Sequence, residues 1–456
     1  MGSAGMVAAE FAATLGLKVA VAERDRPGGD CLWTGCVPSK ALLASARAAH
    51  TIRHADAYGL EAVGPNIDTD RVWRRLGAIQ AQIAATDDDP ERFVAMGVDV
   101  LSGAATLTSP TTVRVGESHT TRYVLLATGS RPALPAIDGL ADAAPLTSET
   151  IFALDESPRS VVMIGGGPIC VELAQALARL GVRVTILQRG PHVLPREEPD
   201  LADRLAGVLR GEGVQIVTGV AVDRVTVAAD ATKTVHAGER SWTASELFVG
   251  AGRTPNVDGL GLEECGVKLG ASGIAVDAAL RTSVKTIYAA GDVAGRHHFT
   301  HAAGYEAARA VRNMFLPGTS RGAYLVPWCT FTDPELAHAG LTEAQARARH
   351  GDDAVRVWRQ DLAHSDRART DSASDGELRI VTAKGRIVGA HVLAPAAGEL
   401  IGELVLAIER KLKLADLASV VHVYPTIALA IQQLAAQASY AKAQRVRWLV
   451  RSRAPG

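Results

Sequence analysis

Two cysteines, Cys31 and Cys36, are the residues of this chain whose types and spacing are best suited to chemistry. They lie in the run G-G-D-C-L-W-T-G-C-V-P-S-K at residues 28–40. Two thiols held close together can cycle between a dithiol and a disulfide. Pro38 is typical of the first turn of a helix, so we expect Cys36 at or just before a helix N-terminus. The helix dipole there stabilises a thiolate.

The spacing of the two cysteines restricts the backbone between them. Residues five apart on a regular helix lie roughly 8 Å from each other, beyond the ~7 Å limit for a disulfide. The backbone must therefore leave the helical conformation around Thr34 and Gly35. The main alternative is a metal site, but C-x4-C is not a usual zinc spacing and no partner pair lies nearby. The other alternative is two unrelated buried cysteines. We favour a redox pair and predict no metal.

The elements that position this pair begin with half of a dinucleotide-binding unit. Gly2 and Gly5 fit the second and third glycines of G-x-G-x-x-G, before a helical stretch that runs to residue 15. Glu23 ends the next apolar run, about where an acid would hold an adenosine ribose. The alternative is that these are simply small residues that initiate a helix. Because the first glycine and the strand before it are missing, we expect that the true start lies upstream or that the sequence is a fragment.

A second unit of the same kind is complete. Residues 160–164 predict a buried parallel strand, residues 172–180 a helix and residues 182–187 the next strand. The turn contains Gly165, Gly166, Gly167 and Pro168, with the small residue Cys170 at the third glycine position. One glycine fingerprint is weak evidence, but two favour an α/β protein that binds two dinucleotides.

Three further apolar stretches, at residues 123–130, 247–253 and 286–292, read as strands that run into glycine or aspartate. Such ends place backbone and carboxylate groups at the carboxyl edge of a sheet, where nucleotides bind. From about residue 324 the pattern changes to alternating strands and long helices without a glycine-rich turn. This last section predicts an α+β interface domain.

Composition narrows the class of protein. The 456 residues suggest about three domains, and 47% hydrophobic residues are typical of a globular chain. A net charge of -1, without a long run of one sign, argues against nucleic acid or an anionic membrane as a partner. Since no apolar run reaches ~18 residues and no secretion signal is seen, we expect a cytoplasmic location. Five scattered cysteines do not suit a secreted disulfide framework.

Several motifs in order resemble those of the class I pyridine nucleotide-disulfide oxidoreductases, the family of dihydrolipoamide dehydrogenase, glutathione reductase and mercuric reductase. They are G-G-x-C-x4-C-x-P-S-K, A-T-G, G-R-T-P-N and A-G-D-V, and the resemblance covers nearly the whole chain. It implies two Rossmann-like three-layer nucleotide-binding domains and a C-terminal α+β dimerisation domain. The implied segments are FAD-binding at 1–145 and 263–320, NAD(P)-binding at 146–262 and dimerisation at 321–456. A homodimer is implied, in which this last domain completes the partner's active site.

The resemblance also implies a mechanism in which NAD(P)H reduces FAD and the flavin reduces the cysteine disulfide. Cys36 would face the flavin as the charge-transfer thiolate, and Cys31 would meet the substrate. Lys40 would lie near the reactive edge of the flavin and pair with Glu172. The implied FAD-binding residues are Gly2, Gly5, Glu23, Gly29, Asp30, Lys40, Ala104, Thr128, Gly129, Ser130, Asp292, His298, Phe299, Thr300 and His301. The implied NAD(P)-binding residues are Gly165, Gly166, Gly167, Pro168, Ile169, Glu172, Gln188, Arg189, Gly252 and Arg253.

The preferred coenzyme follows from the end of the second strand of the NAD(P) unit. NAD enzymes place an acid there to bind the ribose hydroxyls, whereas this chain has Gln188 and Arg189, with Arg196 a turn later. No acid repels a 2′-phosphate, and Arg189 could pair with it. We therefore predict NADPH over NADH, with a solvated surface arginine as the alternative.

The sequence departs from the family near its C-terminus. Thiol-handling members carry H-x-H-P-x-x-x-E, whereas this chain has Tyr424 for the catalytic histidine and Leu429 for its glutamate. A tyrosine, with a pKa of about 10, is a poor base. His422 matches the other, usually structural, histidine. Mercuric reductases also lack the dyad and place an aromatic hydroxyl near the metal, so we predict Tyr424 as catalytic, as in a mercuric-reductase-like branch.

The acceptor of the electrons is left open by this comparison. The vicinal cysteine pair that ends mercuric reductases is missing here, and Cys329 is better explained as buried packing. A second possibility is a quinone or dye reductase in which the flavin reduces the acceptor directly. A third is a non-catalytic nucleotide-binding sensor, which would have no use for the cysteine pair.

Overall fold

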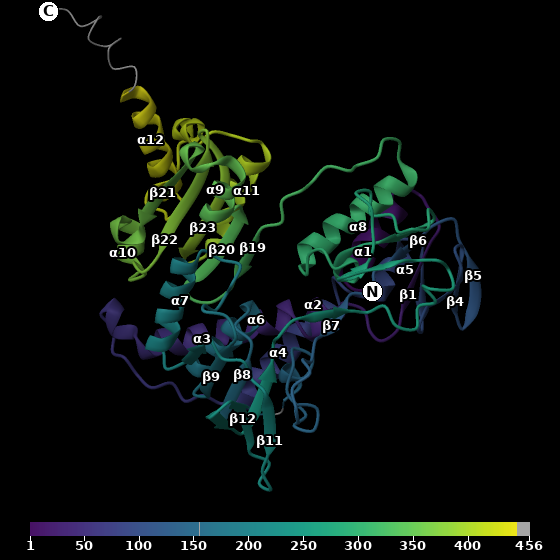
Figure 1. The fold of residues 1–456 in the computed structure, drawn as a ribbon, viewed down its shortest axis with the longest axis horizontal. Coiled ribbons are helices and arrows are strands. Elements are labelled where there is room, and N and C mark those ends of the chain that lie inside the picture. Colours follow the sequence, from purple (N-terminus) through teal and green to yellow (C-terminus); the bar gives the residue numbers. More distant parts are fainter. Residues whose placement is uncertain (155, 445–456) are drawn as a thin grey trace, which may run out of the picture. The chain divides into compact units, whose positions relative to one another are not determined.

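The computed structural model describes residues 1–154 and 156–444, which form two compact units (Figure 1). The N-terminal unit consists of residues 1–45, 67–165 and 222–323. The C-terminal unit consists of residues 46–66, 166–221 and the described part of 324–456. Both mix helices with strands, as an α/β protein does. The predicted NAD(P) segment 146–262 contributes to both units, and the predicted domain boundaries stay predictions.

The N-terminal unit contains three pairs of parallel strands. β1 (Val19–Glu23) pairs with β2 (Val98–Ser102), β6 (Val124–Leu126) with β18 (Ile287–Ala289), and β8 (Ser160–Ile164) with β14 (Glu246–Val249). Every residue of β8 and β18 is buried, as expected of parallel strands covered on both faces. The two strands of each pair point the same way, so within each pair the turns that follow the strands lie at the same edge.

Helices cover these strands. α1 (Ser3–Thr14) packs its alanines Ala4, Ala8 and Ala12 against Ala303 and Ala307 of α8 (Thr300–Phe315), and small side chains allow this close approach. The other helices are α2 (Gly29–Trp33), α3 (Cys36–Arg53), which runs on into the C-terminal unit, α4 (Thr69–Ala84) and α5 (Pro90–Ala95).

Shorter antiparallel strands complete the N-terminal unit. They are β3 (Thr106–Ser109), β4 (Thr112–Val115) and β5 (Glu117–Thr120); β11 (Arg224–Val227), β12 (Lys233–Ala237) and β13 (Arg240–Ala244); β7 (Ser130–Pro132) with β15 (Arg253–Pro255); and β16 (Leu269–Gly270) with β17 (Gly273–Ile274).

The C-terminal unit is built on a five-stranded antiparallel sheet in the order β19-β20-β23-β22-β21. These strands are β19 (Trp328–Thr330), β20 (Glu335–Gly340), β21 (Val355–Asp361), β22 (Glu377–Ala383) and β23 (Arg386–Ala394). Apolar residues of β20, β22 and β23 form a core with those of α11 (Ala397–Glu409) and α12 (Leu429–Gln444). This is the α+β section that the sequence predicts.

The rest of the C-terminal unit comes from the middle of the chain and from short helices. α6 (Pro168–Arg179) leads to β9 (Arg183–Gln188), and α7 (Pro199–Gly211) leads to β10 (Gln215–Thr218), which pairs in parallel with β9. The short helices are α9 (Glu343–His350) and α10 (Asp366–Thr370). Among the described residues, no helix combines the length and hydrophobicity required to cross a bilayer.

Candidate active site

The cysteine pair lies where two helices meet. α2 ends at Trp33, Thr34 leaves the helical region with φ −136°, and α3 begins at Cys36. The predicted break at Thr34 and Gly35 is therefore confirmed. A side chain at position 35 would come within 2.9 Å of the Asp30 carbonyl oxygen, which explains the glycine.

The two sulfurs lie close together, and both are thiols here. A hydrogen bond with Cys36, followed by burial, raises the pKa of Cys31. Cys31 is half-buried and Cys36 is exposed. An unassisted Cys31 thus keeps its proton at neutral pH, and a reaction that needs its thiolate requires a base or a strong thiolate ligand.

Neighbouring elements fix this loop. The amide of Gln80, on α4, donates to the carbonyl oxygens of Leu32 and Trp33, both at 2.9 Å. The indole of Trp33 donates to the Pro27 carbonyl at 2.7 Å. Gln80 lies 47 residues from Trp33, and nothing in the local sequence motif marks it as a support of the cysteine loop.

The predicted flavin segment at residues 298–301 reaches the cysteines. α8 begins at Thr300, and its hydroxyl lies 3.6 Å from the Cys36 sulfur. Phe299 caps this helix, and its ring stacks on His301 with centroids 5.4 Å apart. Lys40 lies one turn after Cys36 on α3, on the same helix face. The structure therefore brings Thr300 and Cys36 together.

Glu172, the predicted partner of Lys40, belongs to the C-terminal unit, whereas Lys40 belongs to the N-terminal unit. Glu172 is buried in the C-terminal unit, where its carboxylate accepts a hydrogen bond from the Phe331 amide at 2.9 Å. The Lys40–Glu172 ion pair stays a prediction.

Arg253 connects four of the sequence motifs. Its guanidinium donates to the Ser130 hydroxyl at 2.6 Å and to the Ser130 carbonyl at 3.0 Å, and it forms an ion pair with Asp30. It also lies 3.6 Å from Asp292, which accepts a hydrogen bond from Ser130 at 2.5 Å. We predicted Arg253 in the NAD(P) set, but these contacts place it among three residues of the predicted FAD set. A motif shows order along the chain and not side-chain direction, so the assignment of Arg253 to the NAD(P) set stays a prediction.

The glycines of the FAD set make a close approach. A side chain on Gly29, whose φ is +56°, would lie 2.7 Å from Gly2 Cα, so position 29 is restricted to glycine. Gly2 caps α1 without a side-chain hydrogen bond, and the first turn of α1 holds no acid. Such a helix N-terminus suits a phosphate. With Asp292 and Thr300, these residues fit FAD.

Other members of the FAD set are less directly engaged. Glu23 pairs with the α-amino group of Met1 and accepts from the Asp25 amide at 2.8 Å, and its ribose contact stays a prediction. The Thr128 hydroxyl donates to the Asn256 carbonyl at 2.7 Å, next to Gly129, which has φ +69°. Gly5 has open space around its Cα, and Ala104 is exposed after β2.

The second glycine turn shows the same restriction. A side chain on Gly165, at φ +118°, would lie 2.5 Å from the Gly250 carbonyl oxygen. Gly166 donates its amide to Gln188 at 3.0 Å, and a side chain there would meet Gln188 at 3.1 Å. α6 follows with Gly167 as its cap, Pro168 in its first turn and no acid there. These residues fit a dinucleotide phosphate.

The two arginines of the coenzyme argument differ in environment. Arg189 is exposed directly after β9, whereas the Arg196 guanidinium lies 4.1 Å above the Trp328 ring. Arg189 is therefore the better placed of the two to meet a 2′-phosphate. Ile169, in the first turn of α6, is also exposed.

The section that replaces the family's dyad carries two polar pairs. Tyr424 is exposed and donates to Asp366 at 3.1 Å; this hydrogen bond raises the pKa of Tyr424 further. His422 contacts the Glu403 carboxylate at 3.0 Å, and its side chain is only 7% exposed. Glu403 was not predicted, because the family motif places the glutamate five residues after the histidine. Glu403 lies 19 residues before His422, on α11, and belongs to no motif.

Comparison with known proteins gives matches over nearly the whole chain. Residues 1–307 match the family described as pyridine nucleotide-disulphide oxidoreductase, and residues 326–435 match its dimerisation domain. The chain is 32% identical over 458 residues to a dihydrolipoyl dehydrogenase of Bacillus subtilis, with 95% of each chain covered. It is 35% identical over 451 residues to a mercuric reductase of Streptomyces lividans, covering 96% of this chain and 94% of that protein.

A solved structure is similar over the same extent. The Cu(II) complex of the HOCl-induced flavoprotein disulfide reductase RclA from Escherichia coli has a TM-score of 0.85 at 27% identity. The match covers 95% of this chain and 97% of that one.

Proposed function

Since this chain belongs to the pyridine nucleotide-disulphide oxidoreductases, which use FAD and NAD(P)H, we propose that it is an NADPH-dependent reductase of a thiophilic metal ion. The ion binds at Cys31 and Cys36. When bound, FAD supplies the transfer of two electrons between the nicotinamide and the cysteine pair. One NADPH then balances the reduction of one Hg(II) to the metal, or of two Cu(II) to Cu(I).

One observation carries the choice of a metal ion. The pKa of Cys31 is raised by its hydrogen bond with Cys36 and by burial, and Tyr424 is a poor base whose pKa is raised by Asp366. Attack on an organic disulfide needs a thiolate and then a proton for the leaving thiol. A soft metal ion displaces the thiol proton itself and needs no acid for a leaving group. Relatives named mercuric reductase, and a structural neighbour described as a Cu(II) complex, support this acceptor class.

The test compares acceptors and variants. Enzyme reduced anaerobically with NADPH is offered Hg(II), Cu(II), oxidised lipoamide, glutathione disulfide and a quinone. We expect metal reduction to fall more than 100-fold in Cys31→Ser and in Cys36→Ser, and to persist in the control Cys265→Ala, since Cys265 lies in a separate buried cluster. Quinone reduction that survives both cysteine changes, without metal reduction in the parent protein, would identify a flavin-direct reductase instead.

A disulfide acceptor is the second candidate, and the His422–Glu403 pair favours it. A histidine held by a carboxylate can move a proton to and from a thiol. If this reading holds, lipoamide or glutathione disulfide is the fastest acceptor. His422→Gln then lowers that activity at least tenfold, whereas Tyr424→Phe leaves it within a factor of two.

The coenzyme preference rests on β9. The strand ends in Gln188 and exposed Arg189, without an acid to repel a 2′-phosphate. We expect kcat/KM for NADPH to exceed that for NADH, and Arg189→Ala to reduce the NADPH value alone. Equal efficiencies with both coenzymes in the parent protein would contradict the preference.

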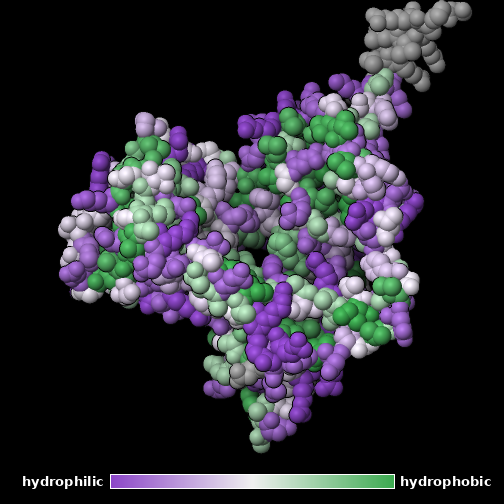
Figure 2. Space-filling model, turned by 180° about the vertical axis from the view of Figure 1, so that it is seen from behind, coloured by the Kyte–Doolittle hydropathy of each residue, from purple (hydrophilic) through white to green (hydrophobic). Residues whose placement is uncertain are grey.

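We also propose a homodimer through the C-terminal unit. Large apolar side chains are exposed on both sides of His422 and on the helices α11 and α12. They are Leu406, Val420, Val421, Val423, Tyr424 and Tyr440. In Figure 2, green hydrophobic residues lie among purple polar ones on the part of the surface nearest the C-terminal end. Exposed apolar patches of this kind mark interaction surfaces. Val421→Glu should convert a dimer to a monomer in light scattering; a dimer that persists would place the interface elsewhere.

A further inference from the structure

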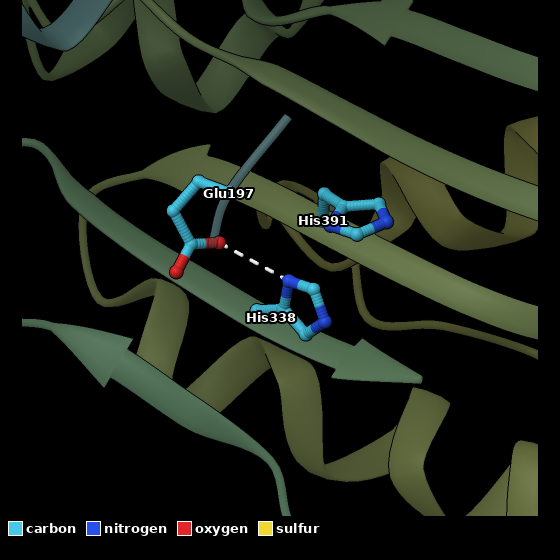
Figure 3. Close-up of side chains that lie close together, drawn as sticks. All are labelled: Glu197, His338 and His391. Atoms are coloured by element: carbon cyan, nitrogen blue, oxygen red, sulfur yellow. Dashed lines mark hydrogen bonds and ion pairs between the residues drawn. The ribbon is translucent and has the colours of Figure 1, made fainter. Parts of the chain in front are cut away.

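A buried cluster of two histidines and a glutamate lies away from the cysteine pair in the sequence. Glu197 precedes α7, His338 lies on β20 and His391 on β23, and the three side chains converge (Figure 3). The two histidines are directly opposite each other in the antiparallel pairing of β20 and β23. All three belong to the C-terminal unit and are at most 6% exposed.

We propose that Glu197, His338 and His391 form a structural binding site for a divalent transition-metal ion, with Zn²⁺ as the best match. One potential ligand atom from each residue lies within 4.8 Å of the others. Two imidazoles and a carboxylate are the ligand types that zinc prefers. A tetrahedral ion with bonds of about 2.1 Å holds its ligands roughly 3.4 Å apart, so only small side-chain shifts are needed to bind it here.

His391 carries the inference. Its Nε2 lies 3.1 Å from the Leu341 carbonyl oxygen, which can only accept, so Nε2 carries the proton. The remaining nitrogen, Nδ1, then presents a lone pair. Among the described residues this atom has no hydrogen-bond partner, although the side chain is fully buried. A buried lone pair without a donor is costly unless a cation meets it.

His338 has the same arrangement. Its Nε2 lies 2.9 Å from the Gly340 carbonyl oxygen, while Nδ1 faces the Glu197 carboxylate at 3.1 Å. An ionised carboxylate can only accept a hydrogen bond, and so can a ring nitrogen without a proton. Either a proton or a metal ion must therefore lie between the Glu197 carboxylate and His338 Nδ1. With both Nε2 atoms donating to backbone carbonyls, both Nδ1 atoms are left to bind the ion. This is the outer-shell pattern that orients metal-binding histidines.

The glutamate is held in a similar way. The Trp328 indole donates to its other carboxylate oxygen at 2.5 Å, and the Trp328 ring stacks on His338 with centroids 3.9 Å apart. Each of the three residues therefore has a supporting contact that leaves one ligand atom for the ion. Bound metal would tie the segment before α7, which follows Arg189 and Arg196, to the five-stranded sheet.

The test uses the full-length, FAD-bound protein in which Cys31→Ser and Cys36→Ser remove the cysteine pair as a competing zinc ligand. The protein is produced in zinc-supplemented medium and desalted, and its metal content is measured by mass spectrometry. We expect about one zinc per chain, and X-ray absorption that shows nitrogen and oxygen ligands without sulfur. Glu197→Gln and His338→Gln should lower zinc occupancy at least tenfold, whereas His350→Gln, at an exposed histidine ending α9, should not.

Three results would overturn the proposal. They are the absence of zinc above background in the parent protein, sulfur in the zinc coordination shell, or equal zinc occupancy in Glu197→Gln. The first two measurements need no variant in the cluster, so they decide the question even if a cluster variant fails to fold. Because the cysteine pair is removed, failure of this site leaves the proposed reductase function untouched.

Discussion

Replacement of Arg253 by methionine tests whether this guanidinium holds the flavin site together. The side chain is 15% exposed and serves Ser130, Asp30 and Asp292. Methionine keeps much of the aliphatic packing but supplies no donor. Among the described residues, the Arg253→Met variant therefore leaves the Asp292 carboxylate, itself only 20% exposed, with Ser130 as its side-chain donor.

The expected cost follows from these contacts. The hydrogen bonds to Ser130 contribute about 1 kcal/mol each, and the contact with Asp292 about 1.5 kcal/mol. Asp30 is 41% exposed, so its ion pair adds at most about 0.5 kcal/mol after screening by solvent. Together these contacts amount to roughly 3–4 kcal/mol, which lowers the Tm by about 6–16 °C for a unit of this size. FAD retention should fall with it, because Asp292 and Asp30 both belong to the predicted flavin set.

The assay records thermal unfolding and the ratio of FAD to protein after desalting. Arg131→Met is the matched control: Arg131 lies on β7, and its ion pair is with Asp258, which is 76% exposed. Such a surface pair is worth at most about 1 kcal/mol. Arg253→Lys should fall between the two, since it keeps the charge but loses the fork of donors. If Arg253→Met melts within about 2 °C of Arg131→Met and keeps its full FAD content, the reasoning is wrong.

Three further outcomes can be measured. Thr300→Val should raise the pH at which the reduced cysteine pair is alkylated by about one unit, because it removes a hydroxyl 3.6 Å from the Cys36 sulfur. Thr300→Ser keeps the hydroxyl and should cause no such shift. An alkylation profile of Thr300→Val that is unshifted in pH would contradict the contact. Arg379→Met should lower the free energy of unfolding in urea by about 3–5 kcal/mol, since Arg379 is 1% exposed and pairs at 2.7 Å with Glu377, whose side chain is only 15% exposed. A loss below about 1 kcal/mol would contradict this. Burial lowers the pKa of His391 to about 3. Between pH ~6.5 and pH 3 only the unfolded chain binds a proton at this histidine, so the free energy of unfolding should fall as the pH is lowered through this range and stay level above it. His391→Phe should flatten that slope in urea titrations at several pH values, and an unchanged slope would assign it to other groups.

The local features of the site were predictable from the sequence. The break between the two cysteines, the helix that begins at Cys36 and the glycine turn at 165–167 are all present. Each follows from short-range constraints: the reach of a disulfide, the conformation of proline, and glycines that keep two segments in close approach. Such constraints act within a few residues, so the order of residue types is enough to reveal them.

Contacts between distant segments were not predictable in this way. Thr300 meets Cys36 across 264 residues, and Arg253 reaches Asp30 across 223. Arg253 was predicted in the NAD(P) set because its motif follows a strand of that segment. The direction of its side chain is decided by the pairing of β15 with β7.

The buried cluster shows the same division most clearly. The sequence by itself determined a flavoprotein with a cysteine pair, and it predicted no metal site, because Glu197 and His338 are 141 residues apart and follow no ligand spacing. Only the tertiary structure decided that His338 and His391 lie opposite each other, through the register of β20 and β23. A slip of one residue would turn one imidazole to the other face of the sheet. Register is set by the packing of the whole sheet, and no short stretch of sequence contains it.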